Sequence, residues 1–198
     1  LARIDDRQFH AANLPFSFHR YFVAPNLLIE PRFPYLFMNT AKPGPAFPRA
    51  KIDYADRTLS LPFAMTGLCL AACMGLARLR RAPVGHRQIT ALAWLAVVPM
   101  TIALLAAVAI SHRYTGDFCP FLILTAAGGV STMATAGRPA RIALAALLFA
   151  ATLWSLAVST AITVHYQGAD VWGTPDGTQE RYEALQRRID GWFCAQPR

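Results

Sequence analysis

Charged residues are confined to particular stretches of this chain, and uncharged, mainly apolar stretches separate them. Asp, Glu, Lys and Arg are absent from four blocks of 20, 25, 20 and 28 residues, which are 58–77, 88–112, 118–137 and 142–169. The helices of a soluble domain alternate polar and apolar faces every turn, so such a domain has no reason to segregate its charges in this way. The pattern therefore excludes a soluble globular protein and predicts an integral membrane protein.

Each block is long enough to cross a bilayer, because about 20 apolar residues in a helix cover a hydrocarbon core of roughly 30 Å. Helix is the expected state, since a backbone in hydrocarbon must satisfy its own hydrogen bonds. The predicted fold is an all-α integral membrane protein with four transmembrane helices in region 61–166, near 61–77, 91–110, 118–136 and 142–164. The third helix is rich in Gly, Ser and Thr, so we expect neighbouring helices to shield it from lipid.

The loops between these helices predict an orientation. The first connection carries four arginines and no acid, and the third connection, 137–141, carries two arginines and no acid. By the positive-inside rule both connections are cytoplasmic, and both ends of the chain are then extracytoplasmic. The net charge of +8 becomes a topology signal, and it lends no support to a nucleic-acid partner.

The ends of the chain differ in character from its apolar centre. Segment 1–60 holds seven of the 14 prolines and seven of the 12 phenylalanines, which makes it too aromatic for disorder and too broken for a long helix. We expect it to lie along the outer membrane interface, either as an ordered connector or as a lid or re-entrant element over an active site. In the tail, 167–198, the spacing of apolar residues predicts a short amphipathic helix over 178–193, with Glu183 and Arg187 one turn apart.

The densest group of polar residues is the outer turn between the second and third predicted helices. It contains His112, Arg113, Tyr114 and Asp117. One interpretation is an interfacial turn in which Arg113 pairs with Asp117. The other is that Arg113 and His112 contact the phosphate of a lipid or lipid-linked substrate, with Tyr114 against the headgroup and His165, at the outer end of the fourth helix, beside them.

The cysteines offer little chemistry. Cys69 and Cys73 share one face of the first predicted helix, but no His or carboxylate is near them, so we interpret them as packing residues. Cys119 and Cys194 fall on the predicted outer side and could form a disulfide there. The sequence contains no nucleotide-binding, zinc-binding or nucleophile-elbow motif. We therefore predict no metal site and no catalytic residue, and the sequence does not identify a cofactor.

A resemblance adds a candidate activity. The string HRYTGDFCPFLILTAAGG resembles the RY-x-x-DF-x-P turn and helix near the C-terminus of many bacterial polytopic membrane proteins that are described as glycosyltransferases using lipid-linked sugars. The upstream string RYFVAPNLLIEPRFPYLF is similar to the segment that precedes their last helices. The positions that match are Arg113, Tyr114, Asp117, Phe118 and Pro120. The resemblance implies a multi-pass protein of the bacterial inner membrane and a polyprenyl-phosphate sugar as donor.

Enzymes of that class generally keep their catalytic carboxylate in the first extracytoplasmic loop, near the N-terminus. The resemblance therefore implies that this carboxylate lies outside the present chain. The chain starts at Leu1 without an export signal, which predicts that it is the C-terminal part of a longer polytopic protein and that the missing N-terminal part packs with it. Two other functions stay open, a non-catalytic membrane scaffold or assembly protein and part of a transporter.

Overall fold

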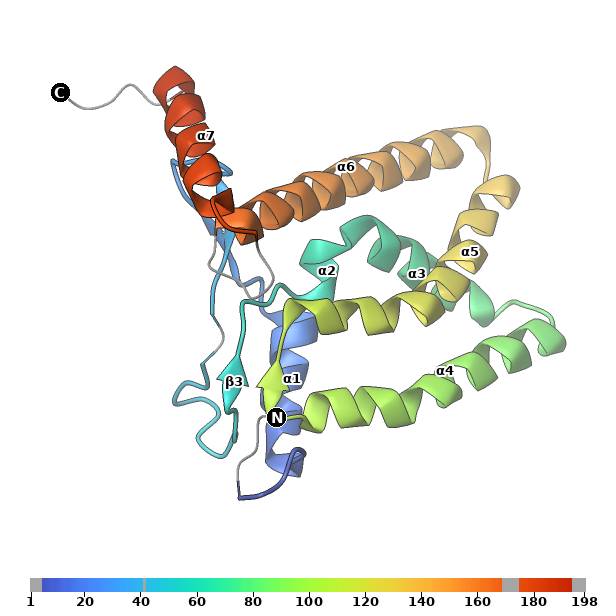
Figure 1. Ribbon diagram of the computed structural model, residues 1–198. Coiled ribbons are helices and arrows are strands. Elements are labelled where there is room, and N and C mark those ends of the chain that lie inside the picture. Colours follow the sequence, from blue (N-terminus) through green and yellow to red (C-terminus); the bar gives the residue numbers. More distant parts are fainter. Residues whose placement is uncertain (1–4, 41, 169–174, 194–198) are drawn as a thin grey trace.

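Three long apolar helices dominate the structure. The computed structural model describes residues 5–40, 42–168 and 175–193, and it is mostly helical (Figure 1). Helices α4 (Val84–Ala106), α5 (Cys119–Thr135) and α6 (Arg138–Gly168) occupy the last three uncharged blocks. By length and composition, the described residues contain three stretches able to cross a membrane, and these are Val84–Ala106, His112–Thr135 and Arg138–Tyr166. The helices predicted in these three blocks are confirmed.

The first uncharged block is divided. Helix α2 (Leu61–Ala64) ends before Met65, whose φ of −128° and ψ of 47° are not helical, and α3 (Thr66–Leu79) begins immediately after Met65. At 1.5 Å per residue, the 14 residues of α3 extend about 21 Å, less than the hydrocarbon core of a bilayer. The fourth span stays a prediction.

Helices α3 and α5 pack in backbone contact. A Cβ atom added at Gly75 would lie 1.9 Å from the carbonyl oxygen of Thr125, and one added at Gly129 would lie 1.9 Å from that of Ala71. Small residues at such a crossing let two helix backbones approach closely. Of the three candidate spans, the one that contains α5 is the most covered, with 33% of its apolar window buried against 11% for each of the others. Neighbouring helices therefore cover α5 more than α4 or α6, on the face that meets α3, while Ile123 and Val130 stay exposed.

Helices α4 and α6 leave large apolar side chains uncovered. Examples on their surfaces are Leu92, Leu95, Phe149 and Leu156, each more than 60% exposed. Uncovered apolar side chains of this size are costly in water and favourable in lipid. The exposed faces are therefore those expected of a protein that is embedded in a membrane.

The N-terminal part, residues 5–60, consists of short elements, and it adds two short strand pairings to a fold that is otherwise helical as predicted. Helical turns η1 (Ala11–Asn13), α1 (Leu14–Phe18) and η2 (His19–Val23) precede an antiparallel pair of strands, β1 (Leu27–Ile29) and β2 (Leu36–Met38). Strand β3 (Tyr54–Ala55) pairs in parallel with β4 (Ala109–Ile110). Because β4 takes residues 109–110, α4 ends at Ala106 and not near 110 as predicted.

The N-terminal part docks on the end of α4. Asn13 is fully buried there; its side-chain amide donates hydrogen bonds to the carbonyl oxygens of Lys51 and Ala107, at 2.9 and 3.0 Å, and its Oδ1 accepts one from the Lys51 backbone N–H at 2.6 Å. Tyr21 is also fully buried, and its hydroxyl bonds the backbone of Ser111. Burial raises the pKa of Tyr21 well above its ordinary value. These contacts hold the segment before the apolar helices as ordered structure.

Helix α7 (Thr178–Phe193) has the predicted extent, and Arg187 pairs with Glu183 at 3.7 Å. It packs on the loop between β1 and β2. The Gln186 side chain donates to the carbonyl oxygen of Phe33 at 2.6 Å, and the Phe33 N–H donates to Asp190 at 2.7 Å.

Figure 1 shows which elements lie at each end of the long helices. The α3–α4 and α5–α6 connections lie at one end, on the right of the view, and the N-terminal part and α7 lie at the other end. The two arginine-bearing connections therefore lie at the same end of the helices.

Candidate functional site

An apolar groove lies where the chain leaves α4 and turns back through η3 (His112–Phe118) into α5. Its volume is about 850 Å³. Helix α4 contributes Met100 and Leu104, the β4 region contributes Val108, and the N-terminal part contributes Phe9. A groove of this size, lined mainly by apolar side chains, has the dimensions of a small-molecule site.

Five polar residues also line this groove. They are Gln8, Asp53, Tyr54 from strand β3, and Arg113 and Tyr114 from η3. The Arg113 guanidinium lies 5.2 Å from the centre of the Tyr114 ring, and its Nη2 is 3.4 Å from the Tyr114 hydroxyl. The groove therefore combines a cation, held against an aromatic ring, and the carboxyl group of Asp53 with a mainly apolar lining.

Arg113 does not form the ion pair that one interpretation of the sequence assigned to it. Within the described residues, the ion pairs are Arg32 with Glu30, Lys51 with Asp5 and Arg187 with Glu183. Asp117 is exposed and is not part of the groove lining. The Arg113 side chain is itself exposed, so most of its donors remain available to an anion.

The His112 side chain contacts the backbone outside the groove. Its Nδ1 accepts a hydrogen bond from the Leu59 N–H at 3.4 Å, and it does not line the groove. Of the four candidates in the predicted turn, the structure brings Arg113 and Tyr114 together in the groove and places His112 and Asp117 outside it.

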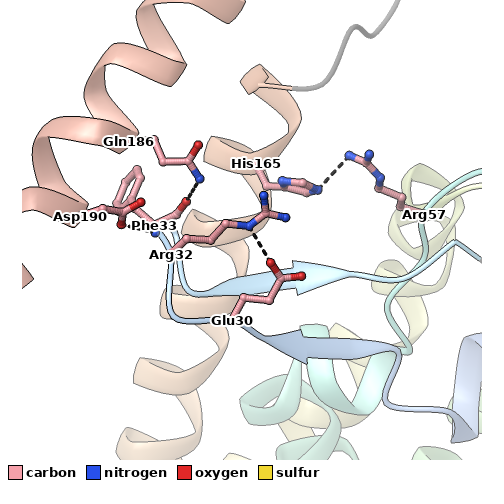
Figure 2. A network of polar contacts seen from close by, with 7 residues as sticks. All are labelled: Glu30, Arg32, Phe33, Arg57, His165, Gln186 and Asp190. Carbon is pink, nitrogen blue, oxygen red and sulfur yellow. Dashed lines mark hydrogen bonds and ion pairs between the residues drawn. The ribbon is translucent and has the colours of Figure 1, made fainter. Parts of the chain in front are cut away.

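His165 lines a different cavity, of about 200 Å³, at the end of α6 (Figure 2). Its Nε2 lies 2.8 Å from the Arg57 guanidinium, which can only donate, so this nitrogen accepts and the ring is neutral with its proton on Nδ1. Arg32 lines the same cavity, bonds Glu30 at 2.6 Å and lies over the Phe37 ring. The expectation that His165 joins Arg113 at one site is therefore not met.

Residues 56–59 form hydrogen bonds both with the turn before α5 and with the end of α6. One carboxylate oxygen of Asp56 accepts hydrogen bonds from the Ser111 hydroxyl at 2.9 Å and from the Tyr166 hydroxyl at 3.4 Å. Sequence reasoning missed Asp53, Tyr54, Asp56 and Arg57. A signal was present, because the string DYADR stands directly before the first uncharged block, as HRYTGD stands before the third.

We expect Asp56→Ala to lower the free energy of unfolding by about 1 to 3 kcal/mol, because it removes the acceptor of the Ser111 hydroxyl and leaves the Tyr166 hydroxyl with the Arg57 carbonyl oxygen alone. Thermal unfolding in detergent measures this. The matched control is Asp117→Ala, which removes an exposed carboxylate with no side-chain hydrogen bond within the described residues. Equal effects of the two variants would show that Asp56 has no such role.

The cysteine predictions have different outcomes. Cys194 lies outside the described residues, so its disulfide with Cys119 stays a prediction. Cys69 and Cys73 carry free thiols. In the described part of the chain, no group of three or more His, Cys, Asp or Glu residues is placed to hold a metal ion.

The fold and the groove together define a class: a mainly helical protein with three stretches able to span a membrane and an arginine-bearing apolar groove at one end of them. Comparison of the chain with protein-family models, with curated proteins and with solved structures gives no match.

Proposed function

We propose that this chain is an integral membrane protein that binds a lipid phosphate in the Arg113 groove, and that the lipid is a polyprenyl-phosphate sugar used by a glycosyltransferase. The observation that carries the proposal is the position of Arg113, which forms no ion pair within the described residues, at a mainly apolar groove of about 850 Å³. The sugar donor and the reaction come from the resemblance of the HRYTGDFCP turn to that class of enzyme.

The chemistry of the groove suits such a ligand. A guanidinium binds two phosphate oxygens at once and is weakly hydrated, so it pairs well with a phosphate at a membrane surface. The apolar side chains of Phe9, Met100 and Leu104 offer contact area to an isoprenoid chain. Tyr114 presents a ring and a hydroxyl, which matches the mixed environment of a headgroup.

The proposed location follows from the charges. The groove lies at the end of α4 that is opposite the α3–α4 connection with its four arginines (Figure 1). If that connection is cytoplasmic, the groove opens at the outer face of the bacterial inner membrane. Polyprenyl-phosphate sugars used at this face would approach the groove from the bilayer.

A membrane scaffold is the second candidate function. Helices α4 and α6 leave large apolar side chains uncovered, and this supports a scaffold. Transmembrane helices of another protein can pack on such faces in place of lipid. A scaffold needs no ligand in the groove, so the binding experiment that follows separates the two functions.

The test is binding of a polyprenyl phosphate to the delipidated protein in detergent, with the uncharged polyprenol as comparison. We expect the phosphate to bind at least tenfold more tightly than the alcohol, and Arg113→Ala to weaken its binding by about 10- to 100-fold, because hydrogen bonds to charged groups contribute about 1.5 to 3 kcal/mol. Arg113→Lys should recover part of the loss, because it keeps the charge but not the two-pronged contact.

The control is Arg49→Ala, which removes an exposed arginine from the N-terminal part of the structure, outside the groove. Binding that is unchanged in Arg113→Ala, or lowered equally by Arg49→Ala, would refute the site and favour the scaffold.

A further inference from the structure

A second cleft, of about 310 Å³, lies at the opposite end of the helices, between the end of α3, the start of α4 and α5. Its basic residues are Arg78, Arg81 and His86, and no acidic residue in the described part of the chain lines it. The positive charge is uncompensated in the sequence as well, because Asp117 is the one acid between Arg57 and Asp170 and lies at the other end of α5.

Glycines in α3 and α5 form part of the walls of this cleft. Gly75 and Gly128 both line it, and Gly128 carries no side chain that would fill it. A Cβ atom added at Gly128 would lie 3.7 Å from Nε2 of His86, so the imidazole faces the glycine across the space. The helices are held in backbone contact at Gly75 and Gly129, which fixes the walls.

The Arg78 side chain contacts Ser131 at the edge of the cleft. Its Nη1 donates to the Ser131 hydroxyl at 3.4 Å, and that hydroxyl donates in turn to the carbonyl oxygen of Gly128 at 2.7 Å. One guanidinium nitrogen is used in this way, and the other donors remain for a ligand. A preformed position lowers the entropy lost when a ligand binds.

Apolar surface continues from the cleft along the outside of the helices. Leu76, Val84 and Ile89 are 41%, 59% and 62% exposed. A molecule with an anionic group and hydrocarbon chains would place its anionic group in the cleft and its hydrocarbon chains along these apolar side chains. Basic pockets between membrane helices bind phosphate headgroups in this manner.

We propose that this cleft binds the phosphodiester headgroup of an acidic phospholipid, with Arg78, Arg81 and His86 as its donors. The site is separate from the Arg113 groove, and it does not depend on the function proposed for that groove. It would anchor the protein to acidic lipid in the leaflet that faces the two arginine-bearing connections.

The experiment measures binding of phosphatidylglycerol and phosphatidylcholine to the delipidated full chain in a neutral detergent, with inorganic phosphate as a further probe. The test variant is Arg78→Gln with Arg81→Gln. The matched control is Arg138→Gln with Arg141→Gln, which removes the same charge from the neighbouring connection without touching the cleft. Arg113→Ala serves as a second control at the other end of the helices.

The test variant is expected to bind phosphatidylglycerol at least tenfold more weakly than the wild type, and both controls within twofold of it. Equal losses in the test variant and in Arg138→Gln/Arg141→Gln would show that diffuse charge, not the cleft, attracts the lipid, and would overturn the proposal. No preference for phosphatidylglycerol over phosphatidylcholine, or inorganic phosphate binding as tightly as the lipid, would also overturn it.

A second variant guards against a loss of binding caused by misfolding. Gly128→Leu keeps every charge and fills the cleft from α5, so it too should weaken phosphatidylglycerol binding at least tenfold. Helix content by circular dichroism and elution as a single species verify that each variant is folded. Wild-type affinity in folded Gly128→Leu would place the lipid elsewhere.

Discussion

Gly75→Ala is expected to destabilise the protein by about 3 kcal/mol, the upper part of the usual range for overpacking, although it adds a single methyl group. That methyl carbon would lie 1.9 Å from the Thr125 carbonyl oxygen and 3.0 Å from the Gly129 nitrogen. Both are backbone atoms of α5, which cannot move aside as a flexible side chain can. The two helices must separate, and the buried contacts of Ala71, Ala72 and Ala126 are then weakened.

The measurement is the apparent Tm in detergent, together with the fraction of protein that elutes as a single species. Gly85→Ala is the matched control, because it makes the same chemical change in a helix where nothing lies within 4 Å of the added atom. We expect it to keep or slightly raise the Tm, since alanine has the higher helix propensity. Equal Tm values for the two variants would contradict the close crossing of α3 and α5.

Asn13→Ala is the second change with a large expected effect, about 3 kcal/mol. It removes the buried partner of the Lys51 N–H and of the carbonyl oxygens of Lys51 and Ala107. Unpaired buried groups cost about 1 to 3 kcal/mol each, and partial exposure to water reduces their sum. Because Asn13 joins the N-terminal part to the end of α4, its loss should release that part first.

Limited proteolysis detects this release, and thermal unfolding measures its cost. We expect cleavage within residues 5–60 of Asn13→Ala at protease concentrations that leave the wild type intact. Asn39→Ala is the control, because Asn39 is exposed and its contacts use backbone atoms. Wild-type resistance in Asn13→Ala would mean that these hydrogen bonds do not hold the segment.

The long helices could be predicted because their signal is local. A stretch without charges, such as 142–169, has one stable arrangement in a bilayer, and the amphipathic spacing in 178–193 is equally direct. The break at Met65 and the end of α4 at Ala106 could not be predicted in this way. The second depends on β4 pairing with β3, a contact between residues more than 50 positions apart, and short strands take their stability from such partners.

The candidate site was predicted in part. Arg113 and Tyr114 were selected because they stand at the edge of an apolar block, and the structure places both at the groove. His112 and His165 were selected by the same criterion, yet each is engaged by a residue of the 57–59 segment, through contacts that span 53 and 108 positions. Position at a membrane edge shows which residues can meet a headgroup, and long-range packing determines which of them remain available.

The groove beside Arg113 can be tested most directly by photo-crosslinking with a polyprenyl phosphate that carries a photoreactive group on its isoprenoid chain, followed by mapping of the labelled residues by mass spectrometry. Binding in the groove predicts labels on Tyr54, Met100 and Leu104, and their loss in Arg113→Ala. Labels spread over the exposed face of α6, at residues such as Phe149 and Leu156, and unaffected by Arg113→Ala would contradict it.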